Sequence, residues 1–189
     1  MQYLLLIIVV FFVAGQNVLE KQYNMKVPNG NALFFAGVSS FVAMLFFVIS
    51  SGLDITFKSS VIGYSVAFAI VYSLCNIGIV LAIRHGSLSI TMLIYSYSLL
   101  IPTFYGIIAL KEPVSYFTWV GLFLLAVSLF LLNFRNETVK ISLKWIVFTL
   151  MAFVGNGMCS TVQKIQQSAF SGSYKNEFMI IALFISGIF

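Results

Sequence analysis

The stretch GSLSITMLIYSYSLLIPTFYGIIALKEPVSYFTWVGLFLLAVSLFLLN, from Gly86 to Asn133, decides the fold. It contains no charge in the 25 residues from Gly86 to Leu110, and none follows in the 22 residues from Pro113 to Phe134. Each run exceeds the roughly 20 residues that a helix needs to cross about 30 Å of hydrocarbon. Because a backbone in lipid must form its hydrogen bonds internally, both runs predict helices, with Lys111-Glu112-Pro113 as a turn at the membrane surface.

Composition places the whole chain in the same class. Hydrophobic residues make up 61% of the chain, charged residues 8%, and the mean hydropathy is +1.06. Soluble domains are about 45–50% apolar and about 25% charged. We therefore expect an all-α, polytopic helical membrane protein. The net charge of +5 comes from Lys and Arg residues spread along the chain, mostly at the ends of apolar runs, so a nucleic-acid partner is not expected.

Similar apolar runs recur along the chain and predict its organisation. Five helices, at about 2–23, 31–51, 61–83, 87–110 and 115–134, would form a first repeat covering residues 1–134. A polar linker follows at 135–144, and residues 145–189 would begin a second repeat with a helix at about 145–164 and an incomplete helix at about 177–189. A cleaved signal peptide is the competing reading of the first run, but no basic residue precedes that run. The short last run predicts that the reading frame continues.

The sixth run resembles the first in layout, because both collect polar residues in their second half and end at a lysine. Setting Lys21 against Lys164 gives an offset of 143 residues, at which Asn17 matches Ser160 and Glu20 matches Gln163. An odd number of helices per repeat would invert the second copy relative to the first, as in many transporters.

Five positions carry a family resemblance. Two small polar residues open the fourth run, a proline lies within it, a glutamate stands at the hairpin tip and a glycine comes early in the fifth run: Ser87, Ser89, Pro102, Glu112 and Gly121. In these features the chain resembles the drug/metabolite transporter superfamily, in its EamA-like branch. The resemblance implies ten helices in two inverted five-helix repeats that move small metabolites or drugs. The chain departs from that pattern at Lys111, where family members often have glycine.

Polar residues at helical spacing within the runs are candidates for a substrate path, because amides and hydroxyls in a bilayer face other helices or a wet cavity. Hydrogen bonding between helices is the plainer reading of each. Glu20 is a candidate proton or cation site, or an interfacial acid paired with a nearby lysine. Pro102 would kink the fourth helix, either to free a carbonyl toward the path or for structural reasons alone. The candidates are Asn17, Glu20, Tyr72, Asn76, Tyr95, Ser98, Pro102, Asn156, Ser160 and Gln163.

Other residues are assigned structural roles. Glu112, Pro113 and Gly121 belong to the hairpin, and Glu112 would pin its tip at the membrane surface. Trp119 and Trp145, near the starts of their runs, are typical of an aromatic belt.

No motif for chemistry is recognisable: the sequence shows no nucleophile with its base, no phosphate loop and no spaced set of metal ligands. We therefore expect no enzyme activity, catalytic residue, cofactor or metal. The two cysteines, Cys75 and Cys159, read as buried small hydrophobes.

These observations favour a secondary carrier or exporter of a small metabolite or drug-like solute, working by alternating access between inverted repeats. Two rivals remain: a non-transporting membrane scaffold or accessory subunit, and a proton-coupled multidrug exporter that uses Glu20. The expected partners are the lipid bilayer, a small solute and protons or another coupling ion, with the oligomeric state open. Loop charges favour an external N-terminus, whereas the resemblance implies a cytoplasmic one in a prokaryotic plasma membrane, and we adopt the latter.

Overall fold

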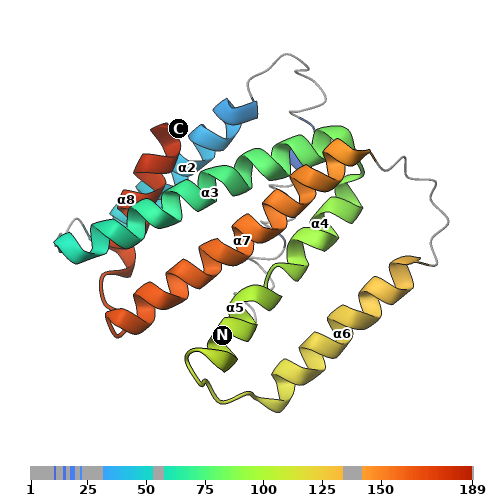
Figure 1. Cartoon of the computed structure of the whole chain (residues 1–189). Coiled ribbons are helices and arrows are strands. Elements are labelled where there is room, and N and C mark those ends of the chain that lie inside the picture. The colour runs from blue at the N-terminus through green and yellow to red at the C-terminus, as the bar shows by residue number, and fades with distance from the viewer. Residues whose placement is uncertain are drawn as a thin grey trace.

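The computed structural model describes residues 32–52, 58–133 and 142–188, together with a few isolated positions between 11 and 22. Every regular element in these ranges is helical (Figure 1). The helices are α2 (Ala32–Ser50), α3 (Ser59–His85), α4 (Leu88–Tyr97), α5 (Leu100–Ile108), α6 (Tyr116–Asn133), α7 (Leu143–Ala169) and α8 (Lys175–Ile188). The expected first helix, with Asn17 and Glu20, lies outside the residues described in detail.

Three helical segments are long and apolar enough to cross a membrane. They are Ser59–His85, Leu88–Ile108 and Leu143–Ala169, the second of which joins α4 and α5. Apolar helix is also present in two shorter pieces, Ala36–Ser50 and Tyr116–Ser128. The all-helical class is thus confirmed, and the three long segments are compatible with membrane insertion.

The ends of α7 differ most from the sequence expectation. The helix begins at Leu143 because the Ser142 side chain caps it, accepting a hydrogen bond of 3.1 Å from the Trp145 backbone N–H. It continues past Lys164 to Ala169, although residues 166–168 are polar in sequence. The Gln166 side chain is fully buried and its amide donates to the Ser173 carbonyl at 3.1 Å. This contact engages the amide nitrogen, while Gln166 Oε1 has no hydrogen-bond partner among the described residues. The helix therefore extends into a stretch where the sequence pattern suggested a loop.

A break separates α4 from α5 at Ser98 and Leu99. In a continuous helix the Ser98 carbonyl would accept from the backbone N–H of residue 102, but Pro102 has none. The Ser98 carbonyl accepts instead from the Ile101 N–H at 3.1 Å, which tightens the turn. The kink expected from Pro102 is therefore present, four residues before the proline.

The core of the molecule is the antiparallel pair of α3 and α7, which lie side by side (Figure 1). Small residues let the two backbones approach closely. A Cβ atom added at Gly78 would lie 2.9 Å from the Ala152 backbone nitrogen, and one added at Gly155 would lie 2.9 Å from the Cys75 Cβ. Close approach through small residues is how helices associate in lipid, where the hydrophobic effect does not drive them together.

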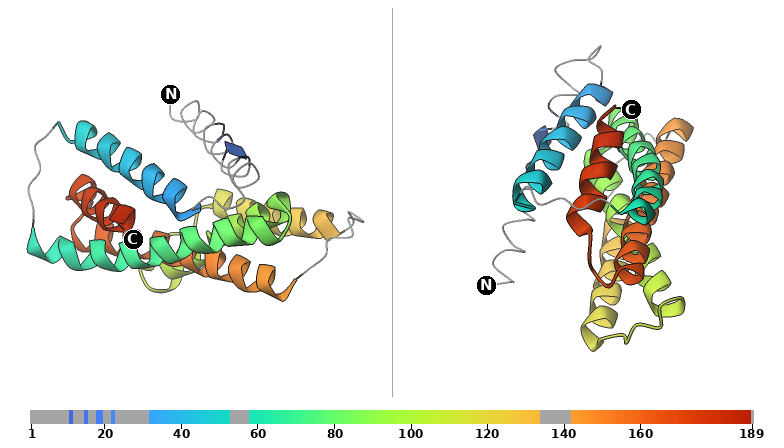
Figure 2. Two further views of the ribbon diagram at one scale, coloured as in Figure 1. Left: turned by 90° about the horizontal axis from the view of Figure 1, so that it is seen from above. Right: turned by 90° about the vertical axis from the view of Figure 1, so that its left-hand side faces the viewer.

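Helix α8 lies between α2 and α3, as both views of Figure 2 show. The rings of Phe41 in α2 and Phe184 in α8 meet edge to face, with centroids 6.4 Å apart.

Helix α6 lies at the margin, where the Tyr97 hydroxyl of α4 donates to the Leu125 carbonyl and lies 2.7 Å from the Ser128 hydroxyl. Much of the outer surface is apolar, as the 81% exposed Phe117 illustrates, which suits contact with lipid chains.

Candidate functional site

Three of the predicted path residues form one hydrogen-bonded network between the fourth and sixth runs. The Tyr95 hydroxyl of α4 donates to Asn156 Oδ1 of α7 at 2.9 Å, and Asn156 Nδ2 donates to Ser98 Oγ at 2.5 Å. Ser98 is fully buried. We call Tyr95, Ser98 and Asn156 the central network. A side-chain amide with both ends engaged fixes the relative position of the two helices at this depth.

Helical spacing explains why these residues meet. Tyr95 and Ser98 are three apart and so share one face of the segment, while the turn caused by Pro102 sets the Ser98 hydroxyl toward α7. Gly157 lies next to Asn156, and a Cβ there would be 2.3 Å from the Ile101 side chain. The missing side chain lets α5 lie directly against α7, which brings Asn156 within reach of both partners.

Cys75 adds α3 to this arrangement. Its sulfur lies 3.9 Å from the Tyr95 hydroxyl and 3.5 Å from the Ala152 carbonyl oxygen, and the residue is 2% exposed. A thiol is a weak hydrogen-bond donor, so it contributes mainly as a small polarisable wall of the network. The sequence reading of Cys75 as a buried small residue agrees with this position but did not connect it to Tyr95.

The interface of α7 with α4 and α5, which we call the seam, has further polar contacts toward both ends. At one end the Trp145 indole donates to Thr91 Oγ1 at 2.9 Å, and its ring fills the space beside Gly86. At the other end Lys164 Nζ lies 2.6 Å from Glu112 Oε2 and 3.5 Å from the Pro102 carbonyl. Polar groups therefore run along α7 from its first turn to near its last.

One hydroxyl on α7 stands out among the described residues. Thr149 is 3% exposed, and its Oγ1 has no hydrogen-bond partner there. It lies one turn after Trp145 and two turns before Asn156, on the same side of the helix. A buried hydroxyl left unpaired costs about 1–3 kcal/mol, so a polar guest in the seam would relieve that cost.

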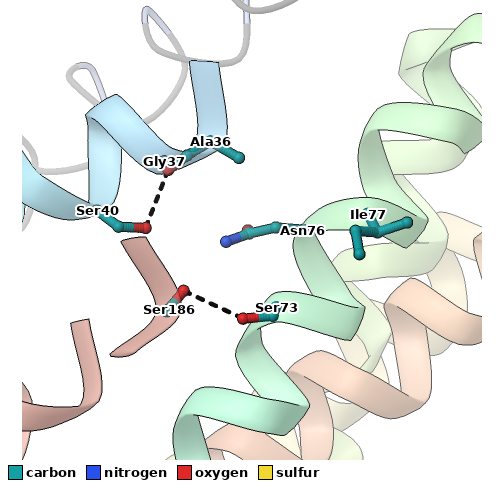
Figure 3. Close-up of a pocket in the computed structure, with 7 residues that line it drawn as sticks. All are labelled: Ala36, Gly37, Ser40, Ser73, Asn76, Ile77 and Ser186. Carbon is teal, nitrogen blue, oxygen red and sulfur yellow. Dashed lines mark hydrogen bonds between the residues drawn. The ribbon is translucent and has the colours of Figure 1, made fainter. Parts of the chain in front are cut away.

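A second polar cluster lies on the other side of α3, among α2, α3 and α8 (Figure 3). It surrounds a cavity of about 20 Å³, enough for one water molecule, which needs at least about 10–15 Å³. Ser73 and Ser186 are joined across it at 3.4 Å, and the Asn76 amide points into the space between α2 and α8 (Figure 3). The cavity is lined by Ala36, Gly37, Ser40, Ser73, Asn76, Ile77 and Ser186.

The structure thus divides the predicted path residues between two clusters. Asn76 lines the small cavity, and Tyr72 interacts with Asn76 and with Ser40 of α2, so these α3 residues connect to the second cluster. Ser160 and Gln163 are half-buried on α7 beyond Asn156.

The hairpin residues are exposed. Glu112 and Pro113 lie at the tip, and Gly121 lies on α6 with open space where a Cβ would stand.

Some residues of the two clusters were not singled out from the sequence. Thr91 lies one turn before Tyr95 and so extends the same polar stripe, a signal that was available. Lys164 was read as an anchor at the end of an apolar run, and Trp145 as part of an aromatic belt. Trp145 is buried, at 6% exposure, whereas Trp119 is 59% exposed.

Within the described ranges, no group of three or more metal-binding side chains lies close together.

Comparison with protein families, curated proteins and solved structures finds no match for this chain. The resemblance to EamA-like transporters therefore stays a prediction. The function has to be argued from the seam and the small cavity themselves.

Proposed function

We propose that this protein is a membrane carrier of a small polar metabolite or drug-like solute, with the seam between α7 and α4/α5 as its path. The observation that carries the proposal is the central network, in which Asn156 bonds both Tyr95 and Ser98 between two segments long enough to span a bilayer. Amides and hydroxyls between membrane helices face other helices or a wet cavity, so this network is suited to line a solute path.

The continuity of the seam supports a path over an isolated bond. Four polar features follow one another along α7: the Trp145–Thr91 bond, the unpaired Thr149 hydroxyl, the central network and the Lys164–Glu112 pair. A solute with hydroxyl or amide groups would exchange these internal bonds for its own. Such an exchange keeps the free-energy cost of entry low, because no polar group is left unpaired.

The crossing of α2 and α8 supports alternating access between inverted repeats. The two helices are antiparallel, as inverted copies of one element that meet at an axis must be. Phe41 and Phe184, which contact each other, are 143 positions apart, the same offset that aligns Lys21 with Lys164. In this proposal α2 and α8 are equivalent helices that meet near the axis relating the two repeats.

The test is transport by the full-length protein in lipid vesicles, screened against radiolabelled solute classes. Asn156→Leu keeps the number and branching of the side-chain heavy atoms and removes both hydrogen bonds, so flux of a transported solute should be lost in protein that still elutes as a folded species. Met158→Leu, a change at a half-exposed position of the same helix, is the matched control and should transport normally. Unchanged flux in Asn156→Leu would remove the seam as the path.

A second candidate, a non-transporting scaffold or accessory subunit, is favoured by one observation. Tyr95, Asn156 and Ser98 satisfy one another, as static helix–helix bonds do. Absence of flux for every solute class, with folded protein in the vesicles, would decide for the scaffold. No enzymatic activity belongs to either proposal.

A proton-coupled exporter remains the more specific form of the carrier proposal. Its acid would be Glu20, which lies outside the described residues. Glu20→Gln should abolish uptake driven by a pH gradient while leaving the protein folded, and unchanged uptake would leave another ion or no ion as the driving force. The proposal also adopts a prokaryotic plasma membrane and a cytoplasmic N-terminus, which protease or labelling access in oriented vesicles would test.

A further inference from the structure

The Glu112–Lys164 pair stands at the end of the seam and joins the hairpin tip to α7. The two charged atoms are 2.6 Å apart, and the side chains are 47% and 28% exposed respectively. Lys164 Nζ also lies 3.5 Å from the Pro102 carbonyl. Ion pairs this exposed are weak, because water screens them and two long side chains must be held in place. A weak pair suits a contact that forms and breaks repeatedly.

Lys164 belongs to the wall of the seam. Asn156, Ser160 and Lys164 are spaced i, i+4, i+8 and therefore share one face of α7, with Lys164 about 12 Å beyond the central network. Glu112 instead lies in the connection between α5 and α6. When the hairpin tip separates from α7, the lysine stays on the helix that lines the path and the glutamate leaves with the tip.

The end of α5 is shaped to admit the lysine. A Cβ on Gly106 would lie 2.1 Å from Lys164 Nζ and 2.5 Å from Glu112 Oε2, so the two charged ends occupy the space beside this glycine. The Glu112 backbone N–H donates to the Gly106 carbonyl at 3.1 Å, which holds the backbone of the hairpin tip against the end of α5. The charged ends of Lys164 and Glu112 therefore share a small space against α5.

We propose that Lys164 is the anion-binding residue of the path and that Glu112 is its resting-state partner, displaced by the carboxylate or phosphate group of an anionic solute. This rests on the proposed transport function. Once Glu112 leaves, the positive charge of Lys164 attracts an anionic solute and not a neutral or cationic one. Binding of such a solute and release of the hairpin tip are then one exchange of partners at Lys164.

The test measures the thermal unfolding midpoint of the purified full chain in detergent, with inorganic phosphate or succinate against chloride at equal ionic strength. Phosphate or succinate should raise the midpoint of the wild type, and the two arms separate a phosphate from a carboxylate preference. Glu112→Gln removes the internal competitor, so the same rise should occur at an anion concentration about two- to fivefold lower. Lys164→Gln should lose the anion-specific rise.

A charge reversal separates this proposal from a purely structural clamp. Glu112→Lys combined with Lys164→Glu keeps an ion pair but places the negative charge on α7. The reversed pair should have wild-type stability without added anion but no anion-specific rise in the unfolding midpoint. A purely structural clamp predicts that the reversed pair matches the wild type both in stability and in its response to anions. An anion response retained in Lys164→Gln, or absent from the wild type, would overturn the inference.

The two proposals fail in different ways. If no solute crosses vesicles but the Lys164-dependent anion response is present, the transport function is lost and the anion site stands. If neutral solutes cross and Lys164→Gln changes neither their flux nor the anion response, transport stands and the anion site is lost.

Discussion

Lys111 has a φ of 51°, in the left-handed region that L side chains rarely adopt. Glycine adopts this conformation without a steric penalty, because it has no Cβ. The chain must reverse at once after Leu110 so that Glu112 can return over Gly106 and meet Lys164. The lysine makes the same turn at a conformational cost of about 1–2 kcal/mol.

Lys111→Gly should therefore stabilise the protein. Relief of the left-handed strain is partly offset by the greater freedom of glycine in the unfolded chain, about 0.4–1 kcal/mol, so the net gain should be about 0.5–1 kcal/mol. Equilibrium unfolding in mixed detergent measures it. Lys111→Ala removes the same charge but keeps the Cβ, and it should give no gain. A loss of stability in Lys111→Gly would contradict a left-handed turn at this position.

Single residues also show how far the sequence could predict the site. Spacing correctly placed Tyr95 and Ser98 on a common face, because helical periodicity is a local property. It placed Tyr72 and Asn76 on a common face as well, but Asn76 lines a small cavity together with residues of α2 and α8. Which helix covers a given face depends on tertiary packing, and periodicity carries no information about it. The buried Trp145 was missed for the same reason.

Among the helices, the close contact of α3 with α7 depends on positions that have no side chain. Gly155 faces the Cys75 Cβ, where an added Cβ would be 2.9 Å away, a separation that real Cβ atoms do not show. Gly121 on α6 has nothing within 4 Å of the same atom. The two glycines thus offer one chemical change in a tight and an open setting.

Gly155→Ala should destabilise the protein by about 1–3 kcal/mol, because the α3 and α7 backbones must move apart to admit the methyl group. Gly121→Ala should be neutral or stabilising by up to about 1 kcal/mol, because alanine is the better helix former and meets no neighbour. Unfolding midpoints of the two variants, measured side by side, check the prediction. Equal effects at both positions would argue against the close α3–α7 contact, and a large loss at Gly121 would restore its assigned structural role.

Over the whole molecule, the sequence predicted the class because every uncharged run must form a helix in lipid, and it placed the kink because Pro102 lacks an N–H. The arrangement of the helices was not predictable in the same way. Antiparallel order follows from short connections, but α8 inserts between α2 and α3 through contacts such as Phe41 with Phe184. Those two residues have no local signal that distinguishes them from other phenylalanines, and only the 143-residue offset connects them.

Alternating access assigns different mobility to the two ends of this architecture. Rigid-body rocking of the repeats should open the seam at Glu112 and Lys164, while Phe41 and Phe184, close to the proposed axis, should move little. In a background with alanine at the two native cysteine positions, cysteine pairs at 112/164 and at 41/184 can each be joined by the same flexible bismaleimide. Measured against the same cysteine pair before cross-linking, the 112/164 bridge should abolish the remaining flux in vesicles, and the 41/184 bridge should leave most of it. If the 112/164 bridge has no effect, the seam does not open at that end. If both bridges block transport equally, the axis does not pass between α2 and α8, and the equivalence of those helices fails with it.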